Sequence, residues 1–164
     1  MKRSNTSKGT IFVTVMTIGL CAGQALAQQA DDLVGRWILV SNDTVGNFGP
    51  HPKGELMFDA SGHFMLLNGR SDLPKFAAGN RVSGTPEENK AIVQGSIALY
   101  GTYSVELAAV SRLLVFNIEY STYPNWDGEV QKRPFTLEGD KLSYTVLPTA
   151  TGGGTAHIVW QRAK

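Results

Sequence analysis

Short runs of alternating apolar and polar residues, separated by tight turns, are the feature that most constrains the fold of this chain. A period of two places successive side chains on opposite faces of a β-strand. From residue 33 onward the pattern predicts roughly eight strands, the longest over 112–122, with compact turns at 59–62 and 138–141. Consecutive antiparallel strands must pack as two sheets or close on themselves. We expect an all-β fold, a small up-and-down antiparallel β-barrel, with a two-sheet sandwich as the alternative.

One inserted α-helix is expected among the strands. Thr85 is a candidate N-cap, Pro86 takes the first helical position, and Glu88 completes a capping box. An apolar face at helical spacing continues as far as Gly101 and comprises Ile92, Val93, Ile97 and Tyr100. The connection before it, residues 69–84, is unusually long. We expect the helix to bury its apolar face, either as a movable lid or as a fixed plug across one barrel end.

The first 27 residues have the pattern of a signal peptide. Basic residues precede an apolar run over 10–22, and Ala25-Leu26-Ala27 is a small-x-small cleavage site. We therefore expect residues 1–27 to be removed and residues 28–164 to form one periplasmic or secreted domain without a membrane span. An N-terminal anchor that is never cut is the alternative.

Loss of this leader changes the charge of the chain. The whole chain has 15 basic and 14 acidic residues, and three basic residues lie in the leader, so the mature form has 12 and 14. A net charge of −2 favours neither nucleic acid nor an anionic membrane as a partner.

Cys21 leaves with the leader, which excludes disulfides and cysteine metal sites. His51, His63 and His157 lack the spacing of metal ligands, so no metal is expected.

The segment Gly35-Arg36-Trp37 opens the first strand and is similar to the Gly-x-Trp signature of lipocalins. The resemblance implies that Trp37 closes one end of a barrel and that a basic residue near the last strand, here Arg162, stacks on it. Four blocks then follow in order along nearly all of the mature chain: GPHPKGELMFDASGHF, GTPEENKAIVQGSIALYGTYSV, STYPNWDGEVQKRPF and GGTAHIVWQR. They resemble the bacterial and fungal lipocalin-like domain family. This resemblance implies a lipocalin-like barrel but does not define a function.

Strand parity predicts a mostly apolar interior with several tyrosine hydroxyls. The side chains expected to point inward are Phe58, Tyr103, Val105, Leu114, Phe116, Ile118, Tyr120, Phe135, Leu137, Leu142, Tyr144 and Val146. A cavity among them would suit a small hydrophobic ligand that has a few hydrogen-bonding groups. The alternative is that these side chains fill the barrel completely. We expect Tyr103, Tyr120, Arg133 and Tyr144 to contact a ligand, and Trp126 to contact it from the barrel rim.

Arg133 is the most informative single residue. Counting back from Phe135 in steps of two places it on the inward face. A guanidinium in an apolar interior needs a partner, and a ligand carboxylate or carbonyl would supply one. The alternative is that Pro134 disturbs the alternation, so that Arg133 lies in solvent or pairs with Glu119.

No catalytic residue and no cofactor are predicted. The carboxylates fall in turns, at the helix start or on outward faces, and no nucleophile-elbow motif is present. The leading hypothesis is therefore an exported protein that binds a small hydrophobic molecule. One alternative is a cofactor-independent cyclase or isomerase on the same barrel, with Arg133, His157 or a tyrosine as its acid or base. Another is a structural or interaction domain with a filled barrel.

Overall fold

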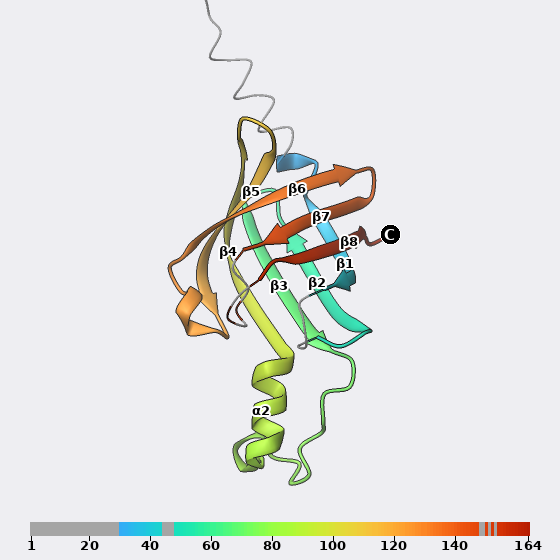
Figure 1. Ribbon diagram of the computed structural model, residues 1–164, viewed down its shortest axis with the longest axis vertical. Helices are drawn as coiled ribbons and strands as arrows, with labels where there is room; N and C mark the ends of the chain where they lie inside the picture. Colours follow the sequence, from blue (N-terminus) through green and yellow to red (C-terminus); the bar gives the residue numbers. More distant parts are fainter. Residues whose placement is uncertain (1–29, 44–47, 148–149, 151, 153) are drawn as a thin grey trace, which may run out of the picture.

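The computed structural model describes residues 30–43, 48–147, 150, 152 and 154–164, and the predicted leader lies outside these residues. The chain forms a closed barrel in which each strand pairs with its sequence neighbour and β8 pairs antiparallel with β1 (Figure 1). The strands are β1 (Gly35–Asn42), β2 (Pro52–Phe58), β3 (His63–Arg70), β4 (Ser96–Leu107), β5 (Arg112–Ser121), β6 (Val130–Glu138), β7 (Lys141–Val146) and β8 (Ala156–Arg162). The predicted up-and-down barrel is confirmed, and the sandwich is excluded.

One end of the barrel is closed by a tryptophan and an arginine. Trp37 is fully buried, and its indole nitrogen donates to the carbonyl oxygen of Leu33 at 2.8 Å. The Arg162 guanidinium lies 4.1 Å from the centre of the Trp37 ring and donates to the carbonyl oxygens of Val34 and Asp32 at 2.7 and 2.5 Å. The stacking implied by the lipocalin resemblance is therefore present. We call this the closed end.

Aromatic side chains fill the barrel next to the closed end. Phe58 packs on Tyr103 and Phe64 packs on Phe116, each pair with ring centroids 4.5 Å apart. Leu56, Leu114 and Leu142 complete this region and are fully buried. This half of the interior is a packed core rather than a binding cavity.

The alternation of β5 breaks near its C-terminal end. Tyr100 pairs with Tyr120, whereas Gly101 pairs with Ile118, so the residue between Ile118 and Tyr120 forms a β-bulge. A side chain at Gly101 would not fit, because a Cβ there would lie 2.0 Å from the Asn117 carbonyl oxygen. Beyond the bulge Tyr120 faces outward, half exposed, and its ring stacks on that of Tyr100. The inward orientation predicted for Tyr120 is therefore wrong.

Helix α2 (Pro86–Gly95) begins where the capping box predicts. The Glu88 amide donates to Thr85 Oγ1 at 3.2 Å, and the Thr85 amide donates to Glu88 Oε2 at 2.9 Å. The helix nevertheless ends before the predicted Gly101, since β4 starts at Ser96. Ile97 and Tyr100 pair with β3 in the sheet, so they do not extend a helix face. Pairing with a neighbouring strand here overrides the local helical spacing.

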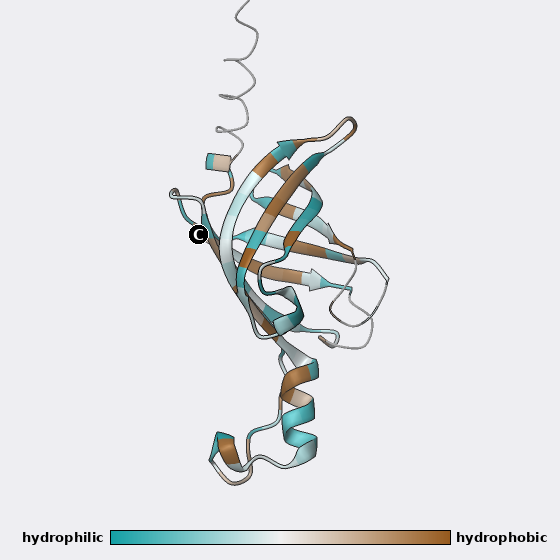
Figure 2. Cartoon of the chain, turned by 90° about the vertical axis from the view of Figure 1, so that its left-hand side faces the viewer, coloured by the Kyte–Doolittle hydropathy of each residue, from teal (hydrophilic) through white to brown (hydrophobic). Residues whose placement is uncertain are grey.

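Helix α2 projects beyond the barrel together with the connection that precedes it, which contains the short 3-10 helix η1 (Arg81–Ser83) (Figures 1 and 2). Of the residues in α2, only Gly95 is buried, and Val93 is 77% exposed. Glu88 Oε1 accepts from the Ala77 amide at 2.8 Å, which ties the helix to the preceding connection. The predicted burial of an apolar helix face is wrong. No helix within the described residues is both long and apolar enough to cross a membrane.

Candidate ligand-binding site

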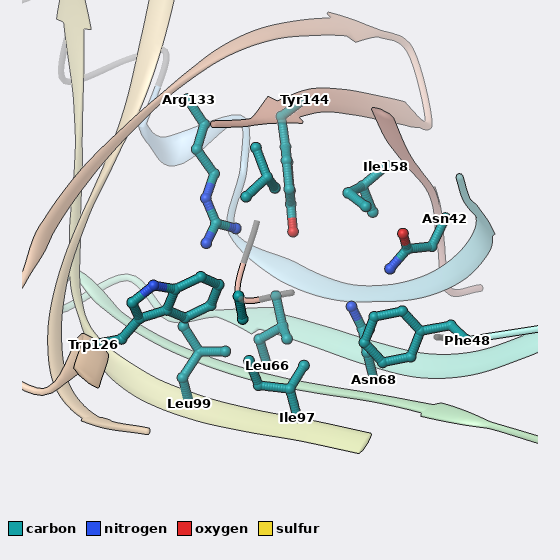
Figure 3. Close-up of a pocket in the computed structure, with 12 residues that line it drawn as sticks. Asn42, Phe48, Leu66, Asn68, Ile97, Leu99, Trp126, Arg133, Tyr144 and Ile158 are labelled. Atoms are coloured by element: carbon teal, nitrogen blue, oxygen red, sulfur yellow. The ribbon is translucent and has the colours of Figure 1, made fainter. Parts of the chain in front are cut away.

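A cavity of about 50 Å³ lies inside the barrel (Figure 3). Its lining residues Asn42, Asn68 and Ile97 lie at the ends of their strands that are opposite Trp37. Much of its wall is apolar and comes from Phe48, Leu66, Ile97, Leu99, Trp126, Val146, Ala150 and Ile158. The polar residues that line it are Asn42, Asn68, Arg133 and Tyr144. This volume holds a few water-sized groups, whereas pockets for drug-sized ligands have roughly 300–1,000 Å³. The cavity therefore has room for only part of such a ligand.

Arg133 reaches the cavity from β6 and is only 3% exposed. It pairs with inward-facing Leu114 of β5, while Pro134 faces outward, so the proline does not disturb the alternation. Within the part of the chain that the structure describes, Arg133 forms no ion pair with a carboxylate. The alternative pairing with Glu119 is therefore absent, and the predicted inward orientation of Arg133 is confirmed.

The interactions of Arg133 leave part of its hydrogen-bonding capacity unused. Its guanidinium carbon lies 4.4 Å from the centre of the Phe116 ring and 5.1 Å from that of Tyr144, and Nη2 donates to Gln131 Oε1 at 2.6 Å. Nε has no hydrogen-bond partner among the described residues. Cation–π contacts contribute about 0.5–2 kcal/mol each. Desolvation of a buried ion costs several kcal/mol, so these contacts offset only part of that cost.

The ionisation of Arg133 and Tyr144 suits hydrogen-bond donation. Burial lowers the pKa of Arg133, an effect that Tyr144 opposes, yet an arginine keeps its proton in proteins. Burial raises the pKa of Tyr144, opposed by the positive charge of Arg133. The Tyr144 hydroxyl therefore stays protonated at neutral pH. It points into the cavity beside the guanidinium (Figure 3), so both groups can donate to one acceptor.

Trp126 belongs to the connection between β5 and β6, which contains the short 3-10 helix η2 (Pro124–Trp126). Asp127 Oδ1 accepts from the Ser121 amide at 2.6 Å and holds this connection against the end of β5. The Trp126 ring is partly buried and lines the cavity, and it meets the Tyr123 ring edge to face at 5.7 Å. Trp126 therefore lies at the end of the barrel that holds the cavity, partly buried, and forms part of the cavity wall.

Tyr103 and Tyr120 lie away from the cavity. The Tyr103 hydroxyl donates to the Asp59 carbonyl oxygen at 3.0 Å near the closed end, and Tyr120 lies on the outer surface. Trp126, Arg133 and Tyr144 therefore come together at the cavity, whereas the other two predicted contact residues do not. Whether the three residues contact a ligand stays a prediction.

His157 also lies outside the cavity. It is exposed on β8, with Nδ1 3.1 Å from Thr145 Oγ1 on the outer face. It is therefore not placed to act as an acid or base in the interior. Among the described residues, no group of three or more His, Cys, Asp or Glu side chains is placed to hold a metal ion.

Asn68 is a site residue that sequence reasoning missed. It is 5% exposed and follows the inward-facing Phe64 and Leu66 at alternate positions of β3. The alternation of inward-facing residues along β3 is therefore sufficient to predict that Asn68 faces the interior. Its Oδ1 has no hydrogen-bond partner among the described residues and packs against Gly54, where a Cβ would lie 2.3 Å from this oxygen. The glycine at position 54 thus makes room for the amide of Asn68.

A larger hollow, of about 640 Å³, lies mainly on the outer side of β2 and β3. Met57, Met65 and Leu67 line it, and each is more than half exposed. Its charged lining residues, Lys53 and Glu55, are exposed, so it lacks the buried charge that Arg133 gives the interior cavity. We therefore regard the interior cavity around Arg133 as the candidate site, although its volume is smaller.

A closed barrel with a buried tryptophan at one end and a cavity at the other is the architecture of a lipocalin-like protein. The chain belongs to the lipocalin-like domain family, whose model matches residues 34–163. It is also 32% identical over 100 residues to a 4'-hydroxy-3'-methoxypropiophenone carrier protein from Aspergillus oryzae (strain ATCC 42149 / RIB 40). This match covers 57% of the present chain and 90% of the carrier protein. Family and relative together indicate small-molecule binding.

Proposed function

We propose that this protein is an exported carrier that binds a small, largely hydrophobic molecule through a carboxylate or carbonyl group. The observation that carries the proposal is the buried Arg133 guanidinium, which faces an apolar cavity and forms no ion pair within the described chain. A ligand acceptor would compensate this charge at the point where the protein does so only in part. The aryl ketone named for the fungal relative is a ligand of this kind.

The polar and the apolar parts of the ligand would contact opposite walls of the cavity. Arg133 and Tyr144 donate to the ligand oxygen, and a hydrogen bond from a charged donor contributes about 1.5–3 kcal/mol. Leu66, Leu99 and Trp126 contact the apolar part of the ligand from the opposite wall (Figure 3). Orientation thus comes from the polar wall, and most of the buried apolar area comes from the other wall.

The test is a titration of the purified protein with benzoate, propiophenone and propylbenzene, followed by isothermal calorimetry. Benzoate and propiophenone should bind at least about tenfold more tightly than propylbenzene, because only they accept a hydrogen bond from Arg133. Arg133→Met should reduce this preference by about tenfold or more. If none of the three probes binds the wild-type protein, the proposal is wrong.

Arg112→Met provides the matched control. Arg112 lies on the neighbouring strand β5 and also stacks on an aromatic ring, that of Phe135 at 4.9 Å, but it does not line the cavity. This variant should keep the wild-type preference for acceptor-bearing probes. An equal loss in both variants would show a general effect of removing an arginine and would contradict the role of Arg133.

Export is a separate part of the proposal and is supported by the leader pattern of residues 1–27. We expect the protein isolated from its own host to be found outside the cytoplasm and to begin at Gln28. Cell fractionation with mass spectrometry of the intact protein measures both properties. A chain that retains residues 1–27 would contradict cleavage.

A further inference from the structure

A second hollow adjoins the cavity at the end of the barrel opposite the closed end. This groove of about 490 Å³ runs between the C-terminal part of α2, the start of β4 and the end of β5. We call it the mouth groove. Ile97 and Ala150 line both the cavity and the mouth groove, so the two spaces lie next to each other and share part of a wall. Together they provide far more room than the cavity alone.

The walls of the mouth groove include apolar and aromatic side chains, of which Ile97 also packs against the barrel core. Val93 lines it from α2 and is 77% exposed, and Ile97 lines it from β4. Tyr123 lines it from the β5–β6 connection, and its ring packs against Trp126, which lines the cavity. The pair Tyr123–Trp126 therefore forms a continuous aromatic wall from the cavity to the groove.

Helix α2 presents Val93 at a defined position. The capping box at Thr85 fixes the start of the helix, and β4 continues directly from its last residue. A bond from the Ala77 amide to Glu88 also ties the helix to the preceding connection. An exposed valine on a helix held at both ends can serve as a binding surface without a change in fold.

We infer that the mouth groove holds the apolar tail of an elongated ligand whose acceptor group lies at Arg133. This inference rests on the proposed function and specifies its ligand class as amphipathic molecules, such as carboxylates with an alkyl chain. The cavity would accommodate the head and the first few carbon atoms, and the adjacent mouth groove, beyond the shared residues Ile97 and Ala150, would accommodate the remainder. Ligands confined to the cavity would leave Val93 and Tyr123 without a role in binding.

A homologous series tests this inference: butanoate, hexanoate, octanoate and decanoate, each titrated calorimetrically into the full-length protein. Affinity should increase by about two- to fourfold for each added methylene, as expected for apolar surface that leaves water. Val93→Ser should weaken decanoate binding by about fivefold and leave butanoate binding unchanged within twofold. Val93 is exposed, so this substitution removes ligand contacts without disturbing the core.

Val82→Ser is the matched control, because Val82 is 92% exposed in the same projecting segment but does not line the mouth groove. Its affinities should equal those of the wild type for every member. Affinity that does not change with chain length, or a Val93→Ser variant that binds decanoate as the wild type does, would overturn the inference while the proposed function stands. If none of the aromatic probes binds, the proposed function fails and the inference fails with it.

Discussion

Arg133 and Arg162 are two arginines that stack on aromatic rings inside one barrel, yet their surroundings differ. Arg162 covers Trp37, donates to two carbonyl oxygens, and lies with Nε 3.3 Å from Asp140 Oδ1. Arg133 donates to Gln131 and also interacts with the side chain of Tyr144, but its Nε has no partner among the described residues. A satisfied guanidinium of the first kind stabilises the fold. An incompletely satisfied one of the second kind has capacity left for a ligand.

The first prediction concerns the stabilising arginine. Arg162→Met should lower the free energy of unfolding by about 2–3 kcal/mol, because it removes a cation–π contact and two charge-assisted hydrogen bonds. Urea denaturation measures the change. Arg36→Met serves as control, because Arg36 forms an exposed ion pair with Glu55, and such pairs contribute about 0–1 kcal/mol. Equal losses in the two variants would contradict the structural role of Arg162.

The second prediction concerns the stability effect of Arg133. Arg133→Met should leave the free energy of unfolding of the purified protein unchanged or raise it, because a buried, incompletely paired charge is replaced by an apolar side chain of similar length. Thermal unfolding and urea denaturation each measure the difference in stability between this variant and the wild type. A loss of about 2 kcal/mol or more would show that the protein itself satisfies Arg133, and it would weaken the argument for a ligand partner.

The third prediction concerns pH. Burial, together with the nearby Asp59 and Asp31, raises the pKa of Tyr103 to about 12. The folded state therefore holds this proton more tightly than the unfolded chain, whose tyrosines have a pKa near 10 (an approximate reference value). The resulting stability is fully present below about pH 10 and is lost as the pH rises through the folded pKa.

Tyr103→Phe should remove this alkaline dependence. The variant should be about 1 kcal/mol less stable than the wild type at neutral pH, through loss of the hydrogen bond to Asp59, and the difference should narrow above about pH 10. Urea midpoints measured across this range test the expectation. Tyr120→Phe, on the outer surface, should follow the wild-type curve. A constant difference between wild type and Tyr103→Phe at all pH values would contradict the effect.

At the scale of elements, the β4–β5 pair shows why a parity argument fails locally. The alternation in residues 112–118 places Leu114, Phe116 and Ile118 correctly, because each inward side chain gains burial. The bulge that follows depends on Gly101, a residue on the partner strand, so the sequence of β5 alone does not reveal it. The end of α2 also depends on a partner strand, because the pairing of β4 with β3 determines where the helix stops.

The fourth prediction tests this dependence. Gly101→Ala should destabilise the protein by about 2–4 kcal/mol, because the new Cβ would lie 2.0 Å from the Asn117 carbonyl oxygen and the two strands must separate. Urea denaturation measures the loss. Gly69→Ala on β3 is the control, because the nearest atom to its added Cβ lies at 3.7 Å, an ordinary contact. Similar stabilities for the two variants would show that position 101 tolerates a side chain.

At the scale of the whole molecule, the barrel has a packed half and a hollow half. The sequence predicts the barrel itself well, because alternation and tight turns act along the whole chain and the Trp37–Arg162 closure follows from the family resemblance. It predicts the position of the cavity less well. Tyr103 and Tyr144 both face inward, but Tyr103 lies in the packed core and Tyr144 lines the cavity. The two residues differ in their position along the barrel axis. This position depends on the stagger of all the strands, so the sequence of one strand does not reveal it.

The hydrogen bonds of the closed end also bring both ends of the barrel domain to the same side of the molecule. The Ala163 amide donates to the Arg36 carbonyl oxygen at 2.8 Å, and Arg162 donates to Asp32, so both ends of the barrel domain meet beside Trp37. The projecting helix α2 marks the opposite end (Figure 1). A tether attached at either terminus, such as a fusion partner, a sensor surface or an uncut N-terminal anchor, would therefore be joined to the barrel at its closed end. The end that holds the cavity would then point away from the attachment, so the attachment would not cover it.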